Sequence, residues 1–240
     1  RKNKILDIFK LIEKRRSVRK FTDEEIPEDI LKKCLEYSLL APNSSNLQPW
    51  EFYWIRSNDK KNKIIESCFS QNAAKTAKEI IVAVSRIDTW KRNKNLLVKF
   101  YESKGNTLPI INKYYNKLIP LIYTYDKLGI TTFFRRIAFA FINIIGIFKP
   151  VMRGPISKRD RLDMATKTTA LACQNLMMTL VSEGFDSCPM EGFDQKRVKK
   201  ILNLNSYCNV VMILGIGKAD TKGIYSERFR INNNLIIKEV

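Results

Sequence analysis

The spacing of apolar residues predicts helices along much of the chain. Apolar side chains recur every three or four positions in five segments, as expected for helices with one buried face. A capping-box pattern at Thr22–Glu25 and Pro27 precede the second of these segments. Gly184 follows the longest one, where it suits a helix C-cap. We therefore expect helices over residues 4–14, 28–40, 59–79, 160–183 and 195–202.

Short apolar runs predict the strands. Residues 50–55, 80–85 and 209–217 are rich in aromatic or β-branched side chains and are short enough for buried strands. Residues 41–46 and 185–193 have the composition of loops. Helices outnumber strands, which indicates a central sheet covered on both faces by helices.

The charge balance adds a second feature. The 240 residues include 43 Lys and Arg against 24 Asp and Glu, which gives a net charge of +19. Such a charge attracts anions, whether phosphorylated cofactors, nucleic acid or an anionic membrane, although it could also reflect solvated faces alone. The basic residues are spread along the chain rather than gathered in a tail, so we expect no nucleic-acid partner.

Several kinds of chemistry are excluded by composition. The chain contains no histidine, which removes Ser-His and Cys-His catalysis and the commonest zinc ligand. Its five cysteines form no Cys-x-x-Cys pair, so we expect no metal site, and their odd number indicates reduced thiols in the cytoplasm. The most apolar stretch, residues 137–148, is too short to span a bilayer, and nothing near Arg1 resembles a signal peptide.

Two segments carry candidate binding chemistry in the first fifty residues. Arg15, Arg16, Ser17 and Arg19 could surround a phosphate with charge-assisted hydrogen bonds, although a solvated basic turn would have the same composition. Residues 42–50 hold a dense set of amide and hydroxyl groups that suits the edge of a planar heterocycle, or forms an ordinary loop before a strand.

Two later segments are weaker candidates. In residues 187–193, Gly192 would let the backbone approach a ligand closely. Alternatively, the segment only connects two helices. Arg228 and Arg230 would lie on one side of an extended segment, or belong to a charged tail.

Together and in this order, the segments resemble the nitroreductase superfamily, over nearly the whole chain. The resemblance rests on RRSVRKF with IP (15–27), LLAPNSSNLQPWEFY (39–53), ALACQNLMMTLVSEGFDSCPMEGF (170–193) and RFR (228–230). It implies an α+β fold with a central, mainly antiparallel sheet flanked by helices, in an intertwined homodimer. It also implies a single domain over residues 1–240, with a mainly helical insertion at about 88–155 like that of a larger subgroup, including RGP at 153–155.

The resemblance further implies one FMN in each of two sites at the dimer interface. Arg15, Arg16, Ser17 and Arg19 match the N-terminal FMN motif, with Arg16 and Arg230 at the phosphate and Arg228 in support. Arg19 matches a basic position at the pyrimidine edge, where its charge would stabilise the reduced flavin. The remaining matches are Ser44, Ser45, Asn46 and Gln48 from the partner subunit, Asn72 and Lys75 near the ring and ribityl chain, and Pro189, Met190, Glu191 and Gly192 beside the flavin edge.

The implied activity is hydride transfer from NADH or NADPH through FMN to nitroaromatic, quinone or similar acceptors in a ping-pong cycle. Because the flavin carries this chemistry, no catalytic side chain is assigned, which agrees with the missing histidine. Two alternatives remain: a different reaction on the same flavin, such as reductive dehalogenation or dehydrogenation of a metabolite, and a non-enzymatic basic protein that binds nucleic acid or anionic lipid.

The insertion has three possible roles at this point. Its aromatic residues could form a lid over the flavin, or an extra dimer contact. Arg135 and Arg136 with the apolar run that follows could instead contact a membrane surface. The aromatic residues in question are Tyr125, Phe133, Phe134, Phe139 and Phe141.

Overall fold

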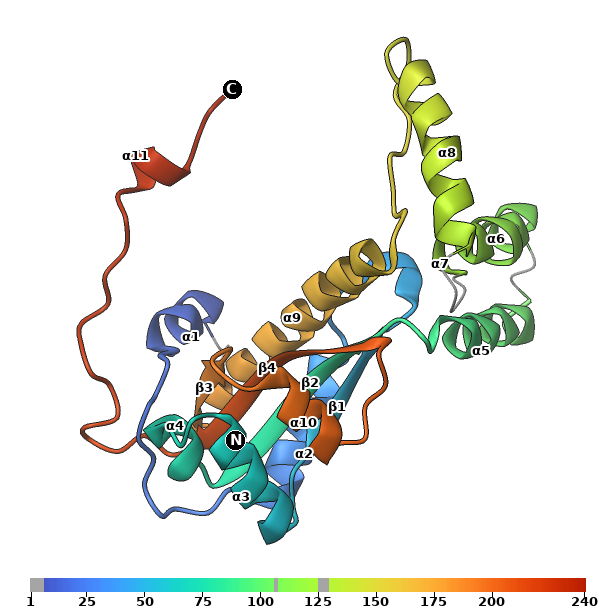
Figure 1. Ribbon diagram of the computed structural model, residues 1–240. Coiled ribbons are helices and arrows are strands. Elements are labelled where there is room, and N and C mark those ends of the chain that lie inside the picture. Colours follow the sequence, from blue (N-terminus) through green and yellow to red (C-terminus); the bar gives the residue numbers. More distant parts are fainter. Residues whose placement is uncertain (1–6, 106–107, 125–129) are drawn as a thin grey trace.

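A four-stranded antiparallel sheet forms the centre of the computed structural model, which describes residues 7–105, 108–124 and 130–240 (Figure 1). The strands are β1 (Trp50–Trp54), β2 (Glu79–Arg86), β3 (Asp186–Met190) and β4 (Cys208–Gly217). Their order in the sheet is β1-β2-β4-β3, so β1 and β3 are the two edges. The three predicted strands agree with β1, β2 and β4 to within a residue, and the predicted α+β class is confirmed.

The helices of the described residues either pack on this sheet or extend away from it (Figure 1). They are α1 (Ile8–Lys14), α2 (Glu28–Ser38), α3 (Asn58–Ser67), α4 (Asn72–Lys75), α5 (Trp90–Ser103), α6 (Pro109–Lys113), α7 (Ile119–Tyr123), α8 (Ile130–Ile145), α9 (Lys158–Ser182), α10 (Gln195–Ile201) and α11 (Asn233–Ile236). Two single turns, η1 (Ser44–Asn46) and the π-helical η2 (Tyr114–Leu118), complete the set. The first residues of the helix predicted over 4–14, Ile5 included, lie outside the described residues.

Alternating side chains of the sheet build two cores. Ile80, Val82 and Val84 of β2 pack against α3, α4 and α10 on one face. Ile81 and Ala83 point the opposite way and pack against α2 and α9. Since successive side chains of a strand point to opposite faces, an apolar run such as 80–84 requires helices on both faces.

The prediction of one helix over 59–79 was wrong. The chain leaves α3 after Ser67, passes through left-handed backbone at Phe69 and Ser70, with φ of 56° and 53°, and re-enters a short helix, α4. The break lets Cys68, Ala73 and Ala74 all reach the same core. Gly215 of β4 permits the close approach, because a Cβ there would lie 2.5 Å from the Ala73 carbonyl oxygen.

The prediction of a loop over 185–193 was also wrong in part, because residues 186–190 form β3. Pro189 made the segment look like a loop, since proline cannot donate a hydrogen bond within a sheet. At the edge of a sheet this restriction is tolerated, and Pro189 lies opposite Leu214 of β4 there. Residues 191–193 do lie outside the strand.

Helices α5 to α8 occupy most of the region predicted as an insertion. Leu97, Tyr115, Ile119 and Tyr123 form a separate apolar cluster with Leu47, which belongs to the loop before β1. Tyr125, one of the proposed lid residues, lies outside the described residues. That residues 88–155 are an insertion into a single domain stays a prediction. Among the described helices, none has both the length and the apolar character needed to traverse a bilayer.

A capping box starts α9. The Ser157 Oγ accepts from the Asp160 N–H at 3.2 Å, while an Asp160 carboxylate oxygen accepts from the Ser157 N–H at 2.8 Å. The Ser157 backbone hydrogen bond is the main cause that holds the pKa of Asp160 below its usual range. A lowered pKa means that the stabilisation is present at neutral pH and is lost as the pH falls through the folded-state value.

Asp160→Ala is therefore expected to lower the free energy of unfolding by about 1 kcal/mol at neutral pH. The difference from wild type should shrink in acid, because the protonated carboxyl of the wild type no longer accepts the bond from the Ser157 N–H as strongly. Urea denaturation at several pH values measures this. Asp163→Ala, an exposed carboxylate three residues further along α9, is the matched control. An equal loss in both variants would contradict the capping role.

All five cysteines are buried and free. Burial raises the pKa of Cys173 to about 12 and that of Cys68 to about 11. Because the thiolate is the reactive form, we expect all five thiols of the native protein to react slowly with a disulfide reagent at neutral pH. Denaturation should release all of them. A thiol that reacts at the rate of free cysteine in the native protein would contradict this.

Candidate functional site

The first predicted segment, residues 15–19, lies along the outer edge of β3. Ser17 forms a parallel bridge with Ser187, and the Val18 N–H donates to the Ser187 carbonyl oxygen at 3.1 Å. Val18 is fully buried and anchors the segment in the core. With Val18 held inward, the neighbouring residues of the segment lie at the surface.

These neighbours meet the last predicted segment in one cavity of about 180 Å³, here called the arginine pocket. Hydrogen bonds join the two segments across more than two hundred residues. The Arg228 guanidinium donates to the carbonyl oxygens of Glu13 at 2.6 Å and Arg15 at 2.7 Å. Arg16 donates to the Ser226 carbonyl oxygen at 2.7 Å. The pocket is lined by Arg15, Arg16, Ser17, Arg19, Ile224, Tyr225, Ser226, Glu227, Arg228, Phe229 and Arg230.

The chemistry of this lining fits a phosphate. Burial and then the charges of Arg228, Arg230 and Arg16 lower the pKa of Arg15. Guanidinium groups that disfavour one another's charge are stabilised by an anion placed among them. Five arginines and the Ser17 hydroxyl face a single carboxylate residue, Glu227, so a dianionic phosphate matches the donors in both charge and hydrogen-bonding capacity.

Tyr225 belongs to the arginine pocket but was not predicted. Its ring lies 5.5 Å from the Arg19 guanidinium carbon, and its hydroxyl accepts from the Asn72 side-chain amide at 3.2 Å. Tyr225 thus links Asn72 to the pocket, although Asn72 itself does not line it. In the sequence, only its position two residues before Glu227-Arg228-Phe229-Arg230 could have indicated that Tyr225 belongs to the site. A single aromatic residue is too common for that position to predict a binding role.

The other residues predicted to bind FMN on this side of the molecule do not line the arginine pocket. Lys75 lines a neighbouring cavity with Lys20, Thr76 and Asp220, not the arginine pocket. Met190 packs its side chain into the core, so only its backbone could face a ligand. Glu191 and Gly192 are exposed just beyond β3, where the Gly192 carbonyl oxygen accepts from Gln71 at 3.1 Å.

Ser187 provides an additional polar group, which belongs to the candidate segment 187–193 but was given no role there. Its hydroxyl is buried, with 1% of the residue exposed, and has no hydrogen-bond partner among the described residues. It lies directly beside Ser17 through the β-bridge. A buried hydroxyl without a partner is costly, which makes Ser187 a candidate for a polar contact beside residues 15–19.

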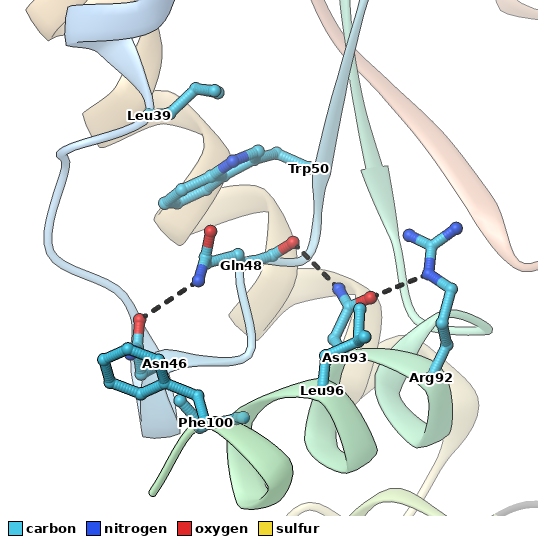
Figure 2. A pocket seen from close by; sticks show the side chains of 9 residues that line it. Leu39, Asn46, Gln48, Trp50, Arg92, Asn93, Leu96 and Phe100 are labelled. Carbon is cyan, nitrogen blue, oxygen red and sulfur yellow. Dashed lines mark hydrogen bonds between the residues drawn. The ribbon is translucent and has the colours of Figure 1, made fainter. Parts of the chain in front are cut away.

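Of the remaining predicted residues, two line a second cavity of about 520 Å³, here called the loop pocket, whereas Ser44 and Ser45 do not line it (Figure 2). Asn46 and Gln48 line it together with Leu39 and Trp50, and α5 forms the other wall. Figure 2 shows the Gln48 side chain directed toward Asn46, with which it hydrogen-bonds at 3.4 Å. The residues contributed by α5 are Arg92, Asn93, Leu96, Leu97 and Phe100.

The loop that carries Asn46 and Gln48 has an unusual backbone. Ser45, Asn46 and Gln48 have φ of 57°, 49° and 46°, in the left-handed region that non-glycine residues rarely adopt. Side chains from the helices hold this conformation. Tyr115 donates to the Ser45 carbonyl oxygen at 3.2 Å, and Asn93 donates to the Leu47 carbonyl oxygen at 2.8 Å. Strain that is held in this way is typical of a binding loop.

The two pockets lie at diagonally opposite corners of the sheet. Trp50 pairs with Ser85, which pairs with Asn209, whereas Ser187 pairs with Ile216 at the other end of β4. Strand spacing and rise place these corners on the order of 25 Å apart. In one chain, Asn46 and Gln48 therefore do not join the arginine pocket.

Comparison with known proteins gives a family match. Residues 12–218 match the sequence model of the Nitroreductase family. MhqN of Bacillus subtilis, which is named as an NAD(P)H nitroreductase, is 26% identical over 213 residues, covering 88% of each protein.

Solved structures with lower sequence identity share the fold. A Staphylococcus epidermidis protein described as an NAD(P)H:FMN oxidoreductase superposes with a TM-score of 0.75 at 19% identity, over 98% of this chain and 97% of its own. An Exiguobacterium sibiricum protein described as a nitroreductase in complex with FMN has a TM-score of 0.70 at 22% identity, over 98% of this chain and 97% of its own.

Proposed function

Because the chain belongs to the nitroreductase family, we propose that it is an FMN-dependent oxidoreductase that uses NADH or NADPH to reduce nitroaromatic, quinone or similar acceptors. It would act as a homodimer in the cytoplasm. The observation that carries the proposal is the arginine pocket, which gathers basic residues from both ends of the described chain around a space that suits a phosphate.

The residues of the arginine pocket would divide the work of holding FMN. Arg16 and Arg230 would bind the phosphate, while Arg228, whose guanidinium already donates to two carbonyl oxygens of residues 13–15, would position the segment. Arg19, stacked near Tyr225, would face the pyrimidine edge of the flavin. A backbone N–H at Glu191 or Gly192 would approach its N5 atom.

Bound FMN would supply the redox chemistry, accepting hydride from the nicotinamide and passing electrons to an acceptor that occupies the same place afterwards. The protein would need no acid or base for this, in keeping with a chain without histidine. Its residues would align donor and acceptor in turn, and the Arg19 charge would favour the reduced, anionic cofactor.

A homodimer would explain why the predicted FMN contacts lie in two pockets. Residues at opposite corners of one sheet cannot surround a single FMN, whereas the loop pocket of one subunit could meet the arginine pocket of the other. Ser44, Ser45, Asn46 and Gln48 would then serve the partner's flavin. Lys75, which lines a neighbouring cavity, would need to extend toward the ribityl chain.

The visible spectrum of the purified protein tests the proposal. We expect flavin absorbance, which bleaches when NADH or NADPH is added without oxygen and returns when a quinone or nitroaromatic compound follows. A colourless protein that does not bind added FMN would refute the proposal. Bleaching that is reversed only by a halogenated or otherwise specific substrate would assign the alternative reaction.

Mixing two defective variants tests the shared site. Arg16→Ala would damage the arginine pocket, and Asn46→Ala with Gln48→Ala would damage the loop pocket. If each site takes one pocket from each subunit, the mixed dimer holds one intact site and recovers activity that neither parent has. Failure to recover activity after subunit exchange, verified by mass, would mean that each chain builds its site alone.

A further inference from the structure

Helix α8 turns its apolar face toward solvent. Its large apolar residues recur three or four positions apart, so they share one face of the helix. They remain exposed, from 44% for Ile137 to 63% for Phe134 and Phe141. Figure 1 shows α8 standing away from the sheet, and residues 146–157 lead from it to α9. The face consists of Ile130, Phe133, Phe134, Ile137, Phe141, Ile144 and Ile145, and Phe148 extends it beyond the helix end.

The opposite face of α8 is the partly covered one, and it carries Phe139 and Ile142 as well as Arg135. Arg135 donates to the carbonyl oxygens of Leu121 at 2.5 Å and Thr124 at 2.9 Å. Arg153 returns along the helix and donates to the Asn143 side chain at 3.2 Å and to the Gly146 carbonyl oxygen at 3.0 Å. A helix of a soluble protein normally directs its most apolar face toward the core. The exposed apolar face of α8 is therefore suited to contact another surface.

The charge around α8 selects the kind of partner. Residues 130–159 contain no Asp or Glu but six basic residues. A second copy of α8 would carry the same positive charge, which opposes pairing of the two faces. An apolar face with Phe and Ile, flanked by Arg and Lys and without carboxylates, matches a surface that is apolar inside and anionic outside. The six residues are Arg135, Arg136, Lys149, Arg153, Lys158 and Arg159.

We propose that α8 anchors the protein to an anionic lipid surface. The helix has 16 residues, and a helix needs about 20 residues to cross a bilayer. At about 24 Å in length it would instead lie in the plane of the interface. Its Phe and Ile side chains would enter the acyl region, while Arg136 and Lys149 remain among the head groups. The proposal is independent of the flavin chemistry.

Sedimentation of the full-length protein with sucrose-loaded vesicles tests the anchor. Vesicles of phosphatidylcholine and phosphatidylglycerol in equal parts should carry the protein down, and vesicles of phosphatidylcholine alone should carry much less. Added salt should reduce the binding. Phe134→Ser combined with Phe141→Ser should weaken it by about tenfold or more. Arg136→Glu combined with Lys149→Glu should have a similar effect, on the order of tenfold.

Phe69→Ser is the matched control, because Phe69 is 71% exposed but lies between α3 and α4. It should bind vesicles as the wild type does, and circular dichroism should be the same for all variants. The proposal is overturned if the wild type does not sediment with anionic vesicles, or if the double Phe variant binds as tightly as the control. It is also overturned if the Phe changes alter only the molecular mass in solution or the kinetics of reduction, since α8 would then be a dimer contact or a lid.

Discussion

Arg16→Ala or Arg230→Ala is expected to weaken FMN binding by about 10- to 100-fold. A hydrogen bond to a charged group contributes about 1.5–3 kcal/mol, which sets this range. Both residues line the arginine pocket, where burial and, after it, the neighbouring guanidinium charges lower the pKa of Arg15. Removing one of them would take away both a positive charge and a pair of planar donors from the phosphate.

Fluorescence titration of the cofactor-free protein with FMN measures this effect. Lys222→Ala is the control, since Lys222 is an exposed basic residue on the nearby turn and does not line the arginine pocket. Arg16→Lys separates charge from geometry, and we expect it to fall between wild type and Arg16→Ala because lysine cannot donate a planar pair of bonds. If both alanine variants retain flavin after dialysis as Lys222→Ala does, the phosphate lies elsewhere.

Leu176→Ala is expected to lower the free energy of unfolding by about 2–5 kcal/mol. Leu176 is fully buried where α9 packs on the sheet, in the core that includes Leu31, Leu180 and Leu214. Truncation would leave a cavity between the longest helix and the central strands, and the tight packing of such a core allows only partial collapse.

Chemical denaturation at one fixed protein concentration measures the loss, because the stability of a dimer depends on concentration. Leu121→Ala makes the same change at a residue that is 69% exposed, and we expect a loss of less than about 1 kcal/mol. Equal losses in the two variants would show that α9 does not pack on the sheet as described.

The strands and the long helix followed from local pattern because burial is strongest there. Residues 80–84 and 209–217 are covered on both faces, and a continuous apolar run is the signature of that environment. The break at Phe69 and Ser70 could not be predicted, since it depends on the space that Gly215, far along the chain, leaves for α4. The strand β3 was not predicted for a similar reason. Pro189 is tolerated in it because β3 lies at the edge of the sheet, which the sequence does not show.

The candidate site could be predicted from the types of residue in the sequence more than from their positions along it. The arginines and Ser17 were chosen because a phosphate would need those groups, and the structure brings them together in one pocket. Tyr225 was missed and Ser187 was given no role, because their contacts with Asn72, Arg19 and Ser17 are created only by the fold. The orientation of α8 was equally hidden, since periodicity reveals an apolar face but not the direction in which it points.

The wide sequence separation within the arginine pocket has a consequence for biosynthesis. The bonds from Arg16 to Ser226 and from Arg228 to Arg15 each close a loop of more than two hundred residues. Contacts of such high order form late, after the sheet between them has assembled. A nascent chain would therefore leave the ribosome with residues 15–19 exposed, and the arginine pocket would be complete only after residues 226–230 have emerged.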